Sequence, residues 1–123
     1  MQPAAEADVA SALHRRDAAL SAGETVTAAD ERLLVRHFLA VLVAKAPGRS
    51  VEVRVPPYAA VQCIPGVRHT RGTPPAVVET DAATWIELAL GRRDFRDAVE
   101  SGAARASGER SDLTPYLPLG EAG

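Results

Sequence analysis

Cys63 is the only cysteine of the chain, and its thiol is the first candidate for chemistry. A base close to it would make it a nucleophile, and His69 follows six residues later. An isolated cysteine within an apolar stretch, however, usually packs as a small hydrophobic residue. We therefore interpret Cys63 as a core residue and expect no catalytic residue in this chain.

The remaining titratable side chains do not form a recognisable metal or acid/base motif. His14, His37 and His69 are too far apart in the sequence to show the spacing of metal ligands. Glu79 and Asp81 are close together, but we expect Asp81 to cap a helix, which turns its carboxylate away from Glu79. We therefore expect no metal, no cofactor and no enzymatic activity.

A polar loop is predicted over residues 66–75, where glycine and proline are frequent. Its side chains Arg68, His69 and Arg71 could hold an anionic head group through charge-assisted hydrogen bonds. Alternatively, the loop is solvated and its arginines pair with neighbouring carboxylates. The sequence leaves both interpretations open.

The composition is that of one globular domain, with 123 residues of which 46% are hydrophobic and 24% charged. The 14 basic residues nearly balance the 16 acidic ones, so nucleic acid is not an expected partner. Apolar residues nowhere continue over the about 18 positions of a membrane span, and no signal peptide is apparent, so we expect a cytoplasmic protein without stable membrane insertion. Lys45 is the only lysine beside many arginines, which indicates a GC-rich and therefore bacterial genome.

Four helices are predicted from apolar spacing and capping residues. Thr27, with Asp30 three places on, resembles a capping box, and Asp81 and Asp94 are typical N-caps. A glycine follows the third helix at Gly91, as is common at helix ends. The expected helices span residues 8–20, 27–46, 81–90 and 94–101.

The alternation of apolar and polar residues, and the glycines and prolines that interrupt it, predict the strands. Residues 51–55 alternate between valine and charged side chains, and residues 58–64 are apolar on nearly both faces. We expect these two strands to be antiparallel neighbours, because little more than two prolines separates them. Further strands are expected at residues 76–80 and 103–107, with a short edge strand at residues 67–69.

This order of elements resembles that of the bacterial sterol carrier protein domain. The resemblance implies an α+β fold with a largely antiparallel five-stranded sheet, covered by helices around an apolar tunnel. It divides the chain into an N-terminal helical extension (residues 1–26), a sterol-carrier-like domain (27–119) and a tail (120–123). Such domains close the tunnel with a C-terminal helix, whereas Pro115 and Pro118 here allow about one helical turn. The segments that carry the resemblance are residues 51–57, 69–75, 77–81, 84–85, 90–91, 98 and 105–108.

The resemblance implies a non-enzymatic carrier that binds a lipid or another apolar small molecule between the sheet and the helices at residues 28–46 and 81–90. The small side chains of Ala104 and Ala106 would leave room for a ligand there. Ordinary core packing accounts for the same residues, and the protein would then be an accessory or protein-interaction module with a solid core. The side chains expected to line the cavity are Phe38, Val53, Val61, Trp85, Leu88, Ala104 and Ala106.

Overall fold

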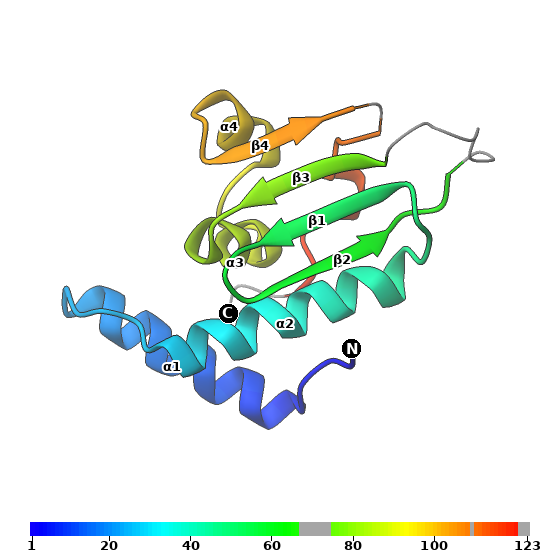
Figure 1. Ribbon diagram of the computed structural model, residues 1–123. Coiled ribbons are helices and arrows are strands. Elements are labelled where there is room, and N and C mark those ends of the chain that lie inside the picture. The colour runs from blue at the N-terminus through cyan, green and yellow to red at the C-terminus, as the bar shows by residue number, and fades with distance from the viewer. Residues whose placement is uncertain (67–74, 109, 121–123) are drawn as a thin grey trace.

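The computed structural model describes residues 1–66, 75–108 and 110–120. Its helices gather on one side of a single sheet, and the other face of the sheet is left uncovered by the described helices (Figure 1). The elements are α1 (Glu6–Ser21), α2 (Ala28–Lys45), β1 (Val51–Val55), β2 (Ala59–Cys63), β3 (Ala76–Thr80), α3 (Ala82–Leu90), α4 (Phe95–Glu100), β4 (Ala104–Ser107) and the 3-10 turn η1 (Thr114–Tyr116).

The strands of the described part form one sheet in the order β2-β1-β3-β4. β1 and β2 are antiparallel, with Val51 opposite Cys63, which confirms that these strands are neighbours. β3 pairs with β4 in antiparallel fashion but with β1 in parallel.

The prediction of a five-stranded, largely antiparallel sheet therefore needs correction, since the described sheet has four strands and is mixed. β2 ends beside the start of β1, and the chain then crosses to the far side of β1, so β3 starts at the same end as β1 and runs parallel to it. Apolar alternation reveals which face of a strand is buried, but it does not reveal the direction of the neighbour. The predicted edge strand at residues 67–69 lies outside the described residues.

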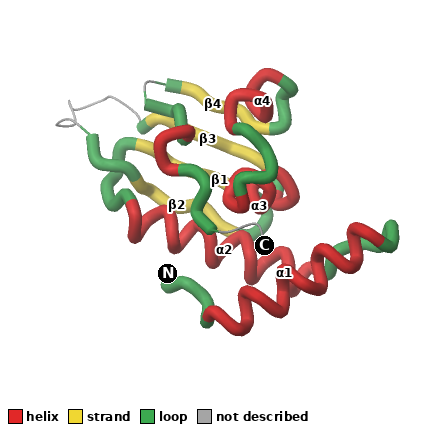
Figure 2. Tube along the Cα trace, turned by 180° about the vertical axis from the view of Figure 1, so that it is seen from behind, coloured by secondary structure: helices red, strands yellow, loops and turns green. Residues whose placement is uncertain are grey.

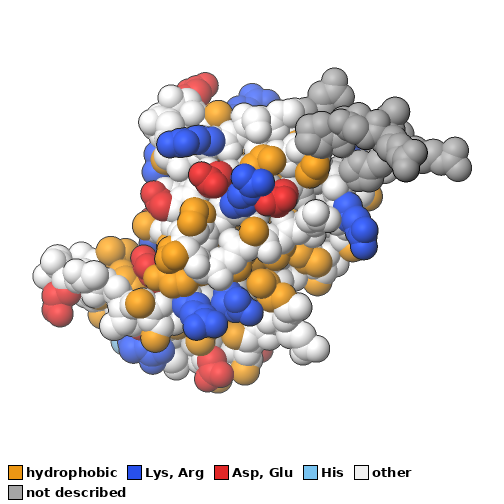
Figure 3. Space-filling view, in the orientation of Figure 1, with side chains coloured by type: hydrophobic (Ala, Val, Ile, Leu, Met, Phe, Trp, Pro, Cys, Tyr) orange, Lys and Arg blue, Asp and Glu red, His pale blue; other side chains and the backbone are white. Residues whose placement is uncertain are grey.

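The inner face of the sheet carries the core. Val51, Val53 and Val55 of β1 point toward the helices and are fully buried. The intervening Glu52 and Arg54 lie on the outer face, where the Arg54 guanidinium donates to the Glu52 carboxylate. Figure 3 shows acidic and basic side chains next to each other over this uncovered face.

α2 and α3 supply most of the helical half of the core. Trp85 of α3 is fully buried, and its indole Nε1 donates to the Val35 carbonyl of α2 over 3.3 Å. The Thr27 hydroxyl accepts a hydrogen bond from the Asp30 backbone N–H, and the Asp81 carboxylate accepts one from Thr84 over 2.7 Å. These contacts confirm the predicted caps, although the Asp30 carboxylate turns to α1 instead of completing a capping box.

Residues 111–119, called the closing segment below, cross the helix-covered side of the sheet beside α3 (Figure 2). The segment contains a single 3-10 turn, as its two prolines predict. Leu113 is fully buried in the core, and the Leu119 N–H donates to the Ala89 carbonyl over 2.8 Å. The segment therefore covers the core where related domains are expected to place a helix.

α1 crosses α2 on the outside of the domain (Figure 1). Val9 and Ala12 are buried in the interface, whereas Leu20 is 50% exposed. Within the described residues, none of the helices combines the length and the apolar character that crossing a membrane requires.

Candidate ligand-binding hollows

The structure places all seven predicted cavity residues on the helix-covered side of the sheet. Five of them are at most 2% exposed and belong to one continuous core: Phe38, Val53, Trp85, Leu88 and Ala104. Val61 and Ala106 are half-buried and pack against the margin of that core. That a ligand contacts these side chains stays a prediction.

Ala106 borders an open hollow of about 340 Å³, called the Ala106 hollow here. α4 contributes one wall with Phe95 and Val99, and the start of the closing segment contributes another with Ser111. Arg96, Glu100 and Asp112 bring charge to its rim. A small apolar floor with a charged rim is the usual composition of a site for an amphiphilic molecule.

A second hollow of about 240 Å³, called the Pro118 hollow, borders the later part of the closing segment. Leu88 and Phe95 form its apolar part, together with Leu117 and Pro118. Phe95 is thus shared by both hollows, and its side chain is 5% exposed. The closing segment therefore separates two hollows that meet the same aromatic residue.

Few hydrogen bonds that the structure describes tie the closing segment to the rest of the domain. Lys45 donates through Nζ to the Tyr116 carbonyl over 2.9 Å, and Leu119 is bonded to Ala89 as described. At Gly91, φ is +76°, which favours glycine, and an added Cβ would lie 3.1 Å from the Pro118 side chain, a tight contact. The segment thus rests against the helices mainly through packing.

The rim charges of the Ala106 hollow are fixed by local contacts. The hydroxyl and the backbone N–H of Thr114 donate to Asp112 and hold the pKa of that carboxyl below its usual value, and Arg96 adds to the effect. Asp112 is therefore ionised at neutral pH beside a guanidinium. This pair could contact a polar head group while an apolar chain lies on Phe95 and Ala106.

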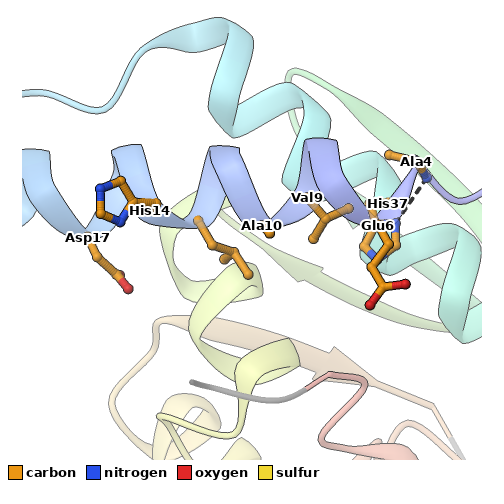
Figure 4. A pocket seen from close by; sticks show the side chains of 8 residues that line it. Ala4, Glu6, Val9, Ala10, His14, Asp17 and His37 are labelled. Atoms are coloured by element: carbon orange, nitrogen blue, oxygen red, sulfur yellow. Dashed lines mark hydrogen bonds between the residues drawn. The ribbon is translucent and has the colours of Figure 1, made fainter.

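A larger hollow, of about 730 Å³, follows α1 and was not predicted from the sequence. We call it the α1 hollow; Figure 4 shows its side chains along one face of the helix. Val9 and Leu13 form its apolar floor, with Asp17 farther along the helix. From α2, His37 accepts a hydrogen bond at Nδ1 from the Ala4 N–H over 3.0 Å, and burial lowers the pKa of His37, which favours the neutral ring that this bond needs.

Three successive residues of α1 form ion pairs that the sequence reasoning missed. Arg15 binds Asp30 of α2, Arg16 binds Glu87 of α3 over 3.1 Å, and Asp17 binds Arg92 over 2.7 Å. The position of Arg16 in line with Val9 on α1 predicts that it faces the core, and the structure buries it to 3% exposure. No local signal in the sequence points to its partner Glu87, which lies 71 residues away.

The other candidate residues are dispersed. Cys63 is fully buried, and burial raises the pKa of its thiol to about 11, so little thiolate forms at neutral pH. Asp81 caps α3 while Glu79 lies on the outer face of the sheet, so the two do not share a site. Arg68, His69 and Arg71 lie outside the described residues. Across the residues that the structure covers, no three potential metal ligands come together.

The fold and the hollows together define a small α+β protein with a helix-covered sheet and an apolar region beneath its C-terminal segment. The family model described as a bacterial SCP ortholog matches residues 27–119. The chain belongs to this family of bacterial sterol carrier protein-like domains. The matched range includes the sheet and the closing segment but not α1. No curated protein matches the sequence.

Proposed function

We propose that this protein is a non-enzymatic bacterial carrier, which binds a lipid or another apolar small molecule beneath the closing segment. The observation that carries the proposal is the pair of hollows that share Phe95 and border the same segment. Family membership supports an apolar ligand, and the volume of the Ala106 hollow, taken by itself, reaches the lower end of the usual pocket range of about 300–1,000 Å³. The buried thiol of Cys63 fits the reducing cytoplasm.

The energetics favour a ligand with a long apolar chain. A ligand that joins the two hollows has to displace part of the closing segment and uncover side chains such as Leu113 and Leu117. Exposure of the fully buried Leu113 and the partly buried Leu117 costs at most about 3–6 kcal/mol, and each methylene that leaves water contributes about 0.8 kcal/mol. An acyl chain of more than about eight methylenes therefore offsets this cost, whereas a short organic acid does not.

The test is titration with a fluorescent fatty-acyl probe and with a sterol-like probe. We expect micromolar or tighter binding of at least one of them, with a shift in the emission of Trp85 because Leu88 of the same helix borders the Pro118 hollow. Ala106→Phe fills the Ala106 hollow and should weaken binding at least about tenfold, a loss of about 1.4 kcal/mol.

Ala60→Phe is the matched control, because Ala60 is exposed on the outer face of the sheet opposite Arg54. Its affinity should stay within about twofold of that of the unaltered protein, and thermal melting should confirm that both variants fold. Equal affinity in the Ala106→Phe variant would place the ligand elsewhere. Absence of binding by both probes would refute the carrier function.

The second candidate function is an accessory or protein-interaction module. The observation in its favour is the dense core, in which Phe38, Val53, Trp85 and Leu88 are almost inaccessible to water. In such a module Ala106→Phe should overpack the protein and destabilise it by about 1–3 kcal/mol, without any effect on a ligand. The same pair of variants therefore separates the two functions.

A further inference from the structure

α1 lies outside the range that the family model matches, and it is attached by a few apolar side chains together with ion pairs. The helix precedes the matched residues 27–119 and is joined to them by a short connection that includes Gly23, with φ +70°. Its fully enclosed apolar contacts are those of Val9 and Ala12, while Leu13 is half-buried. Both of the enclosed side chains are small.

The ion pairs connect α1 to two places: Arg15 binds α2, while Arg16 and Asp17 join Glu87 and Arg92 in one network, in which Arg16 lies 4.0 Å from Asp17 and Arg92 lies 4.0 Å from Glu87. Arg15 thus reaches one side of α1, whereas Arg16 and Asp17 both reach the residues at and just after α3. Arg15 donates three hydrogen bonds to the Asp30 carboxylate, from Nε at 3.0 and 3.2 Å and from Nη2 at 2.8 Å, and these lower the pKa of Asp30. Arg16 meets Glu87 at the middle of α3. The rotation of α1 about its axis is thus fixed by charge.

The third pair reaches the candidate ligand site. Asp17 borders the α1 hollow, and Arg92 borders the Pro118 hollow. Arg92 donates to both carboxylate oxygens of Asp17, at 2.7 and 3.1 Å, and this contact lowers the pKa of Asp17. Arg92 directly follows Gly91, against which Pro118 of the closing segment packs. The Asp17–Arg92 ion pair therefore lies between the α1 hollow and the Pro118 hollow. It is also next to the point where the closing segment meets α3.

We propose that α1 is an ion-paired latch that regulates access to the ligand site beneath the closing segment. In the latched state Asp17 holds Arg92 at the rim of the Pro118 hollow and Arg16 holds Glu87 of the adjoining helix. In the released state α1 swings away about residues 22–27, and the side chains around Arg92 and Pro118 are free to move apart. This inference rests on the proposed carrier function.

The physical basis is the difference between the attachment of α1 and that of the core. The Asp17–Arg92 pair is partly exposed on both sides, so it contributes little and is screened by salt, whereas the contacts of Trp85 and Leu88 do not depend on ionic strength in this way. Local opening of α1 should therefore occur more often than global unfolding, and high salt should make it more frequent. Because the family domain provides the ligand contacts, release should alter the rates of binding more than the affinity.

The experiment measures the kinetics of binding of the fluorescent fatty-acyl probe by stopped flow, in 0.01 M and 1 M NaCl. Over this range the Debye length falls from about 30 Å to about 3 Å. For the unaltered protein we expect the association and dissociation rate constants to rise together by about fivefold, which corresponds to about 1 kcal/mol. Asp17→Asn should show most of this increase already in 0.01 M NaCl, with a dissociation constant within about twofold of the original.

Asp97→Asn is the matched control. Asp97 is an exposed carboxylate of α4, and it does not line the α1 hollow, the Pro118 hollow or the Ala106 hollow. Its rate constants should follow those of the unaltered protein at both salt concentrations. Hydrogen exchange adds a readout without ligand: amides of residues 6–21 should exchange faster in Asp17→Asn, while those of residues 82–90 stay unchanged.

The outcomes separate the two proposals. Binding of the probe with rate constants that do not depend on Asp17 would overturn the latch and leave the carrier function intact. Unchanged exchange of residues 6–21 in Asp17→Asn would overturn the latch as well. Absence of probe binding to the unaltered protein would instead refute the carrier function, on which the latch depends.

Discussion

Replacement of Trp85 by alanine should destabilise the domain more than any other single truncation of a described side chain. Trp85 is the largest of the fully buried side chains. A tryptophan buries about 150–250 Å², and at about 25 cal/mol per Å² its loss amounts to about 4–6 kcal/mol. Partial collapse of the surroundings lowers this figure, so we expect a loss of about 3–5 kcal/mol. Domains of this kind are stable by only about 5–15 kcal/mol.

The measurement is urea unfolding followed by far-ultraviolet circular dichroism, because Trp85→Ala contains no tryptophan to report on. The midpoint should fall while the slope with urea stays unchanged, which identifies a change in stability rather than in compactness. Trp85→Phe keeps an aromatic ring but loses the hydrogen bond to Val35, so its loss should be smaller than that of the alanine variant.

Leu20→Ala is the control for this series, because Leu20 is 50% exposed and its truncation should alter the stability by less than about 0.5 kcal/mol. A loss below about 2 kcal/mol for Trp85→Ala would refute the reasoning, since it would mean that α3 does not anchor the core on the sheet. A loss equal to that of Leu20→Ala would mean that the indole is in contact with water.

Two further predictions concern titratable groups. The Cys63 thiol, with its pKa raised to about 11 by burial, should react with a thiol reagent at pH 8 far more slowly than in urea-unfolded protein; equal rates would contradict its burial. Burial lowers the pKa of His37 below the value of about 6.5 in the unfolded chain, so the unfolded state binds more protons and stability should fall as the pH decreases below about 6.5. Comparison of urea unfolding at pH 7.5 and 5.5 should show a smaller decrease for His37→Gln, and equal decreases would contradict the role of His37.

The local structure of this domain is well determined by short-range signals. Threonine and aspartate are preferred at the N-caps of helices, and Thr27 and Asp81 both cap helices here. The valine alternation of β1 likewise fixes which of its faces is buried. These features depend on residues within one or two turns of each other, so the sequence contains all that is needed to predict them.

The features that the sequence does not predict depend on distant partners. The parallel pairing of β1 with β3 follows from the path of the chain after β2, which alternation does not encode. The burial of Arg16 depends on Glu87, and that of Asp30 on Arg15, both across helix interfaces. The hollows also depend on residues that are distant in the sequence. The Ala106 and Pro118 hollows arise where α4 and the closing segment approach each other at Phe95. Residue types alone favoured a cavity and a solid core equally.

The uncovered face of the sheet has a consequence for the proposed carrier function. Along this face Glu52 and Arg54 of β1 stand beside Glu79 of β3 and Arg105 of β4, so acids and bases alternate in register. Stacking of two such faces would remove all of these ions from water, at a cost that their mutual attraction does not offset. A stoichiometric carrier has to be abundant, and abundance favours aggregation of sheets that are apolar on both sides. The charged face should therefore keep the protein dispersed at high concentration, as the proposed carrier function would require.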